Sequence, residues 1–191
     1  MNIDFNAIFL ERERASAISQ TGHPTPYKCW FGGTAKNSNV EVRFKHYITF
    51  SKDCFSHNAA QQNISIFVDP KTDLPEWKVI AGNLDSTTIV EPLSFCLELS
   101  PQNCHESGSK IGGNPYYIRS AQAQLLQSKM QEMNLGFLLQ LDEEDFFPAQ
   151  TPGIDKYLRD SLCGGVIYVF AEIKTQASLI SPDNFIVGHQ I

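Results

Sequence analysis

The sequence predicts an α+β fold, mostly antiparallel β-sheet with a few helices, in a single domain over residues 1–191. Segments with a strand pattern outnumber helical segments along the chain. The strands do not alternate with helices in the regular βαβ order of a parallel sheet. A length of 191 residues falls within the range expected for one domain.

Two helices and a shorter helical turn are predicted. Residues 3–19 carry separated apolar side chains, and the proline-containing segment 22–26 ends this pattern. A second helix is expected over 121–133, with Ser120 as its N-cap. Residues 154–162 are expected to form a helical turn or two.

The clearest strand pattern runs from Val40 to Phe50. Apolar residues and His46 alternate there with polar residues and Tyr47, which is typical of a half-buried strand. Further strands are predicted at residues 64–68, 77–80, 86–90, 93–99, 135–141 and 165–173, with a short edge strand at 185–187.

Two of these strands are apolar at nearly every position and are expected to be neighbours in the core. The side chains expected to be buried there are Phe137, Leu139, Leu141, Ile167, Tyr168 and Val169.

The composition is that of an ordinary globular protein, with 42% hydrophobic and 19% charged residues. The net charge is −6, and the basic residues form no stripe that could follow a phosphate backbone. A nucleic-acid partner is therefore not expected.

A cytoplasmic location without membrane contact is predicted. The first residues show neither a basic nor an apolar signal region, and no run of 18 apolar residues occurs. The five cysteines are odd in number and widely spaced, which favours reduced thiols.

The pair Cys104-His105 places a thiol beside a base. A catalytic pair needs the base within reach of the sulfur in space and oriented by a third group, which adjacency in sequence does not supply. A pair of surface residues is the simpler interpretation.

Four consecutive carboxylates, Asp142, Glu143, Glu144 and Asp145, follow a predicted strand. The ligand spacing and glycine of a calcium loop are missing, and the five histidines lack zinc-site spacing. No metal and no cofactor is therefore predicted, and a solvated acidic turn explains the run. The same carboxylates could instead meet a basic protein partner.

Three segments occur in an order that resembles the YwqG-like family of bacterial proteins. They are Ser109-Lys-Ile-Gly-Gly-Asn-Pro-Tyr-Tyr-Ile118, Leu135-Gly-Phe-Leu-Leu-Gln-Leu-Asp142 and Cys163-Gly-Gly-Val-Ile-Tyr-Val-Phe170. The resemblance covers about residues 107–173. It implies no established enzymatic activity, and it implies a role as an immunity protein encoded beside a bacterial toxin.

Four residues of these segments are expected to hold local structure. Gly112 and Gly113 supply backbone freedom for a turn, and Pro115 fixes its exit direction. Gln140 interrupts an apolar strand, so a buried amide there would need partners, which the backbone of the glycine turn could provide.

The sequence contains no self-sufficient catalytic motif, and no catalytic residue is assigned. We expect a non-catalytic protein-binding module, specifically an immunity protein that neutralises a cognate toxin. Two alternatives stay open: an enzyme of unrecognised, hydrolase-like type, and a structural adaptor.

Overall fold

A computed structural model describes residues 8–9, 28–31, 34–35, 40–50, 52, 62–71, 75–82, 89–90, 96–98, 109–111, 114–142, 161, 165–173 and 180–190. In residues 8–9, 28–31, 34–35, 89–90, 96–98, 173 and 180–184 the description is limited to the backbone.

The described strands form two five-stranded sheets and a two-stranded ribbon, and every described strand pair is antiparallel. Sheet I has the order β1 (Ile8–Phe9), β9 (Lys110–Ile111), β10 (Leu135–Asp142), β11 (Val166–Ile173), β12 (Ile180–Gln190). Sheet II has the order β6 (Glu76–Gly82), β5 (Asn63–Asp69), β4 (Lys45–Phe50), β2 (Lys28–Phe31), β8 (Cys96–Glu98). The ribbon pairs β3 (Thr34–Ala35) with β7 (Ile89–Val90).

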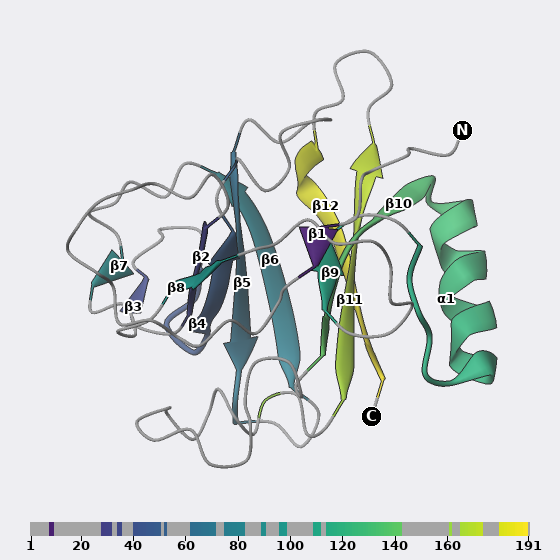
Figure 1. Ribbon diagram of the computed structural model, residues 1–191, viewed down its shortest axis with the longest axis horizontal. Helices are drawn as coiled ribbons and strands as arrows, with labels where there is room; N and C mark the ends of the chain where they lie inside the picture. The colour runs from purple at the N-terminus through teal and green to yellow at the C-terminus, as the bar shows by residue number, and fades with distance from the viewer. Residues whose placement is uncertain are drawn as a thin grey trace.

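The two sheets and the helix among the described residues form three layers. Figure 1 shows sheet II on one side, sheet I in the middle, and α1 (Ser120–Glu132) against the outer face of sheet I. The edge strands β6 and β12 lie next to each other, and Trp77 of β6 meets His189 of β12 at a ring distance of 6.0 Å. The predicted α+β class with a mostly antiparallel sheet is therefore confirmed.

The core between the sheets comes from the apolar strands. Leu139 pairs with Val169 and Leu141 with Ile167, so all four side chains share one face of sheet I, and each is fully buried. The predicted pairing of the two apolar strands is thus confirmed. Of the core residues expected on them, Phe137 is the exception, because it is half-buried between sheet I and α1.

The helix covers the other face of sheet I. Met130 of α1 packs with Val166, Tyr168 and Phe170 of β11. Leu126 lies so close to Gly188 of β12 that a Cβ at Gly188 would stand 2.9 Å from its Cδ2. The helix therefore rests directly on the sheet at a position without a side chain.

Two sequence-based predictions of local structure are wrong, and a third, the edge strand near the end of the sequence, is right but too short. Ile8 and Phe9 lie in a strand, not in a helix over 3–19, because their backbone pairs with β9. The N-cap of α1 is Arg119, which makes no side-chain capping bond, and Ser120 is already helical. The edge strand expected at 185–187 extends over Ile180–Gln190.

The strand predicted over residues 40–50 is also corrected. It begins only at Lys45, because a turn precedes it in which Phe44 N donates to Glu41 O at 3.0 Å. Val42, expected on the apolar face, is 95% exposed. The strand that remains is buried on both faces rather than one, since Tyr47 and Thr49 are buried as fully as Ile48.

Several other predictions lie wholly or mostly outside the described residues. They are the turn at Gly112 and Gly113, the acidic residues Glu143, Glu144 and Asp145, the pair Cys104-His105 and the helical turn at 154–162, of which residue 161 alone is described. The single-domain boundary of 1–191 stays a prediction.

Candidate functional site

Residues 114–119 connect β9 to α1 without regular structure, and we call them the connector. Its backbone groups lack the partners that a helix or strand supplies, so they must bond to side chains or water. Three buried polar side chains of sheet I provide those bonds: Gln140, Tyr168 and Gln190. We call these three the glutamine–tyrosine anchor.

Gln140 holds the first part of the connector. It lies in β10, is 1% exposed, and its Oε1 accepts a hydrogen bond from Tyr116 N at 2.9 Å. Gln140 is therefore buried and bonded to backbone, but the observed partner is Tyr116, whereas the expected partner, the backbone of Gly112 and Gly113, lies outside the described residues. Pro115, which precedes Tyr116 in the sequence, is half-buried and has no N–H to satisfy.

Gln190 holds the second part, where the chain enters α1. Its Oε1 accepts from Ile118 N at 3.0 Å and from Arg119 N at 3.4 Å. Its Nε2 donates to Arg119 O at 3.4 Å. The amide of Gln190 therefore bonds to backbone N–H groups and to a backbone carbonyl at the start of the helix.

Tyr168 links the connector backbone at Tyr116 to the side chain of Gln190. Its hydroxyl lies 2.8 Å from Tyr116 O and 3.0 Å from Gln190 Oε1, so one hydroxyl hydrogen is shared between two acceptors. Its ring stacks at a tilt on Tyr117 with 5.2 Å between centroids. Burial raises the pKa of Tyr168 to about 12, so this hydroxyl stays protonated and acts as a donor at neutral pH.

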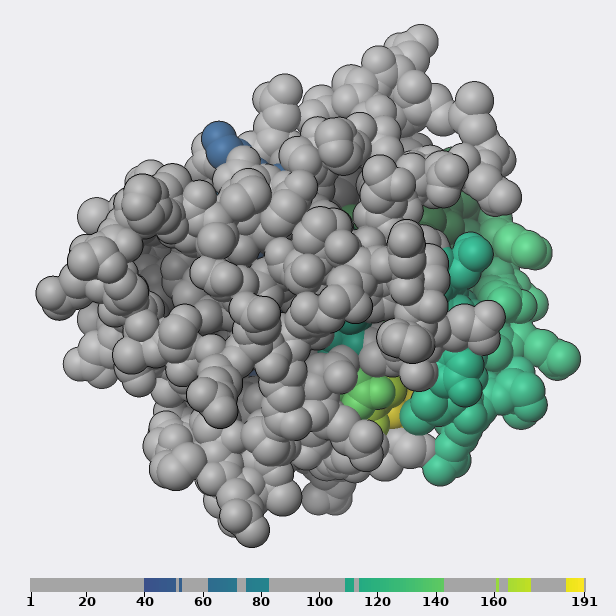
Figure 2. All heavy atoms as spheres, viewed as in Figure 1, coloured from purple at the N-terminus to yellow at the C-terminus, as the bar shows by residue number. Residues whose placement is uncertain are grey.

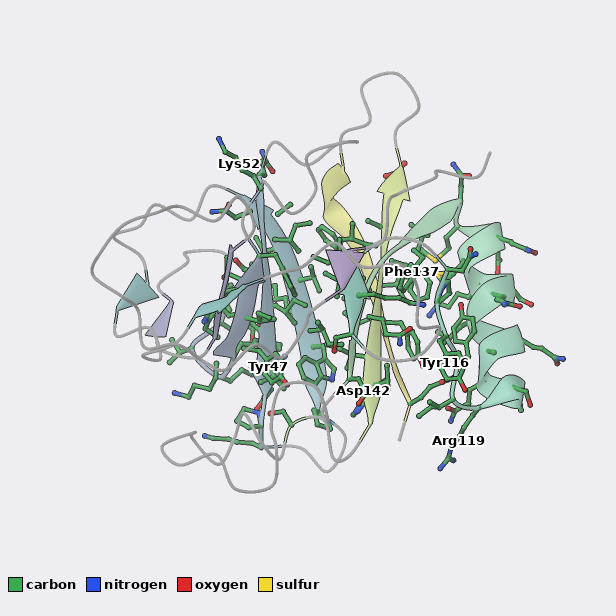
Figure 3. The ribbon with its side chains drawn as sticks, in the orientation of Figure 1. Tyr47, Lys52, Tyr116, Arg119, Phe137 and Asp142 are labelled. Carbon is green, nitrogen blue, oxygen red and sulfur yellow. The ribbon has the colours of Figure 1, made fainter. Side chains whose placement is uncertain are left out.

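The anchored connector presents two large apolar side chains to solvent. Tyr116 is 40% exposed and Ile118 is 44% exposed, although their backbone groups are fixed to buried side chains. Figure 3 places Tyr116, Arg119 and Asp142 toward the same end of sheet I.

Asp142 is the one residue of the predicted acidic run that the structure describes. It ends β10, two positions after Gln140, and its side chain is half-buried. Its backbone N–H donates to Ser109 Oγ at 2.7 Å, and the same hydroxyl donates to Asp142 O at 3.3 Å. Ser109 therefore fixes the strand end from which the acidic run continues.

A second polar cluster lies on the face of sheet II that points away from sheet I. His46 Nε2 is 2.6 Å from Thr49 Oγ1, which is 2.8 Å from Ser65 Oγ. The register shift between His46 and Ile48 inserts one extra residue, Tyr47, into β4. That bulge turns His46 and Thr49, three positions apart, toward the same face.

This second cluster resembles a base beside two hydroxyls, but it is closed to solvent. His46 is 2% exposed, Thr49 is fully buried and Ser65 is 1% exposed. The Phe67 ring covers the imidazole edge-on at 5.6 Å. The arrangement satisfies buried polar groups and leaves no approach for a substrate to Ser65.

Arg43 forms a third polar cluster at the turn before β4. Its guanidinium bonds to Glu76 at 2.6 Å, Glu41 at 2.9 Å and the buried Asp69 at 3.1 Å. It also lies 4.5 Å from the centre of the Phe44 ring. The hydrogen bonds that Arg43 donates to Glu76, and then to Glu41, raise the pKa of Arg43.

Among the residues whose side chains are described, no three His, Cys, Asp or Glu side chains gather in a way that could hold a metal ion. No described helix is both long and apolar enough to cross a membrane.

Gln140 can be recognised in the sequence because an amide interrupts an apolar run, whereas the other two anchor groups were not predicted. Tyr168 was expected in the core for its ring, with no role for its hydroxyl. Gln190 lies near the end of the chain, and nothing around it signals that it reaches the start of α1.

Comparison of the chain with models of known families, with curated proteins and with solved structures gives no match.

Proposed function

We propose that this chain is a protein-binding module that neutralises a cognate bacterial toxin, as an immunity protein of the YwqG-like family. The proposal places it in the cytoplasm, and its partner surface combines the connector with the acidic run. The surface consists of the exposed side chains Tyr116 and Ile118 together with Asp142, Glu143, Glu144 and Asp145.

One observation carries the proposal: hydrogen bonds to buried side chains hold the backbone of the connector, yet the connector presents apolar side chains outward. Tyr116 and Ile118 are 40% and 44% exposed on a backbone held by Gln140, Tyr168 and Gln190. Ordering a flexible loop would cost free energy on binding, and a fixed backbone avoids that cost. Tyrosine is also among the residues that dominate binding energy at protein interfaces.

The charge of the neighbouring strand end supports a basic partner. Gln140, which bonds to Tyr116, lies two residues before Asp142, where four consecutive carboxylates begin. The whole chain carries a net charge of −6. Carboxylates suit a toxin whose active site is basic, because complementary charge speeds association and fixes orientation.

The test is a binding assay with the product of the gene adjacent to the one that encodes this chain. Wild-type protein is expected to form a complex that survives size-exclusion chromatography and to protect cells that express the toxin. If no adjacent gene product forms a complex with the chain and the chain protects cells from none of them, the immunity role is overturned.

Matched variants locate the surface. Tyr116→Ala or Ile118→Ala keeps the backbone bonds of the connector and is expected to weaken binding by about 30-fold at a central contact. Replacing Glu143, Glu144 and Asp145 by alanine is expected to slow association and to reduce its salt dependence. The control is Val42→Ala, which shortens a side chain that is 95% exposed in the turn before β4. If the control weakens binding as much as Tyr116→Ala, the assigned surface is wrong.

The enzyme alternative has its own outcome in these experiments. If the purified chain shows hydrolase activity, and Cys104→Ala or His105→Ala abolishes it, the chain is an enzyme and the binding-module proposal is wrong.

A further inference from the structure

Strand β12 meets α1 and the connector at two neighbouring positions. Gly188 and Gln190 are two residues apart in the strand, so they point to the same face of sheet I, the one that α1 covers. Gln190 bonds to Ile118 and Arg119 at the entrance of the helix, and Gly188 lies against Leu126 further along it. Figure 2 shows α1, in green, along one side of the molecule, with a small yellow area of β12 beside the teal of the connector.

The close approach of Leu126 to β12 depends on the missing side chain at Gly188. A Cβ at this position would stand 2.9 Å from Leu126 Cδ2 and 3.1 Å from Leu126 Cδ1. Ordinary van der Waals contact begins at 3.4 Å, so the leucine would have to move back by about half an ångström. The φ angle of Gly188 lies outside the left-handed range, so what the glycine provides here is space.

Leu126 lies between two buried residues on the same side of α1. Ala123 is three positions before it and Met130 four positions after it, and Met130 is packed against β11. In a close-packed layer an added methyl group is accommodated by shifts of the backbone as well as of side chains. A side chain at position 188 would therefore lift α1 from sheet I.

The bonds at the helix entrance have little tolerance for such a shift. Arg119 N lies 3.4 Å from Gln190 Oε1, and Arg119 O lies 3.4 Å from Gln190 Nε2. A contact of about 3.6 Å between such atoms is no longer a hydrogen bond. Lifting α1 by half an ångström would break both bonds and would stretch the 3.0 Å bond from Ile118 N to Gln190.

We propose that Gly188 is a positioning residue for the partner surface. Because it has no side chain, α1 lies at the depth at which Gln190 can hold the connector, and with it Tyr116 and Ile118. The consequence for binding rests on the proposed function, whereas the coupling between Gly188 and the connector is a property of the chain alone. Gly188 lies on the face of sheet I away from sheet II, so a substitution there leaves the core between the sheets intact.

The first test is amide hydrogen exchange of the full chain, measured by NMR without any partner. In Gly188→Ala the N–H groups of Ile118 and Arg119 are expected to exchange about tenfold faster than in wild type, the change that corresponds to the loss of one hydrogen bond. Gly82→Ala is the matched control, because Gly82 is also a strand glycine and a Cβ there meets no atom within 4 Å. The control is expected to leave the exchange of the connector unchanged.

A second substitution separates positioning from a general loss of stability. Leu126→Ala removes both Cδ atoms that an alanine at position 188 would meet. In the double variant L126A/G188A the helix can return to the sheet, so Ile118 and Arg119 are expected to exchange no faster than in Leu126→Ala alone. Independent losses of stability would add instead, and the double variant would then exchange fastest of all.

The second test measures binding to the product of the adjacent gene. Gly188→Ala is expected to weaken binding by about three- to tenfold, because a released connector must be ordered again in the complex. Gly82→Ala is expected to bind as wild type does. The double variant L126A/G188A is expected to bind as tightly as Leu126→Ala alone.

Three results would overturn the proposal. One is wild-type exchange of Ile118 and Arg119 in Gly188→Ala, which would mean that Leu126 turns aside and α1 stays in place. Another is a double variant that exchanges faster than both single variants. The third is unchanged binding by Gly188→Ala despite faster exchange. If wild type binds no adjacent gene product, the proposed function fails, and the exchange experiment still decides whether Gly188 positions the connector.

Discussion

Gln190 of β12 accepts a hydrogen bond from the backbone N–H of Ile118 at 3.0 Å, although 72 positions separate the two residues in the chain. The bond ties the last strand of sheet I to the entrance of α1. With Gln140 and Tyr168 it fixes the connector that carries the proposed partner surface. The position of this surface therefore depends on side chains that lie outside it.

Gln190→Leu is expected to destabilise the protein. Leucine has a similar size but leaves the N–H groups of Ile118 and Arg119 without their acceptor. Because Gln190 is buried whereas Ile118 and Arg119 are exposed, water can replace part of the lost bonding, and we expect a loss of about 1–2 kcal/mol in the free energy of unfolding. Urea denaturation measures it. Gln127→Leu, on the exposed side of α1, is the matched control and should change stability by less than about 0.5 kcal/mol.

The protein is expected to lose stability in alkaline solution because the Tyr168 hydroxyl is buried. Burial raises the pKa of Tyr168 from 10.0 to about 12, so the folded state keeps the proton at a pH where the unfolded state releases it. This contribution is complete below pH 10 and is lost as the pH rises from 10 toward 12. Tyr168→Phe should be less stable at pH 8 by about 1 kcal/mol, through the lost hydroxyl bonds. Its deficit relative to wild type should shrink toward pH 12. A deficit that stays constant over that range would contradict the assignment.

Leu139→Ala tests the core between the sheets. Leu139 is fully buried on the face of sheet I toward sheet II, so its truncation leaves a cavity and should cost about 2–5 kcal/mol. Leu125→Ala removes the same atoms from an exposed position and is expected to change stability by less than about 0.5 kcal/mol. Chemical denaturation of the two variants compares them. Equal effects would place Leu139 at the surface.

Thr49→Val tests the polar cluster of sheet II. Valine keeps the shape of threonine but removes the hydroxyl between His46 and Ser65, leaving two buried polar groups without that partner. We expect a loss of about 1–3 kcal/mol, measured by thermal and urea unfolding. Thr49→Ser keeps the hydroxyl and is expected to lose less. A serine variant as unstable as the valine variant would mean that the methyl group, not the hydroxyl, matters at this position.

The sequence by itself determined the strands whose identity depends on local pattern. The apolar runs at residues 135–141 and 165–173 form paired buried strands because continuous apolar side chains require burial on both faces. The helix over 121–133 was found within one residue of its observed bounds, Ser120–Glu132. Gln140 was identified as a buried group in need of partners because an amide cannot be buried among apolar side chains without them.

Tertiary structure alone decided where the polar groups meet. The extra residue at Tyr47 changes the alternation of β4, so His46 and Thr49 share a face although strict alternation separates them. Ile8 and Phe9 form a strand because β9 offers them backbone partners, a pairing across about a hundred residues that no local pattern encodes. The bonds from Gln190 to the connector depend on how β12 lies beside β11. Side-chain periodicity reports which face of an element is apolar, whereas the partner of a polar atom is fixed by register and packing between distant segments.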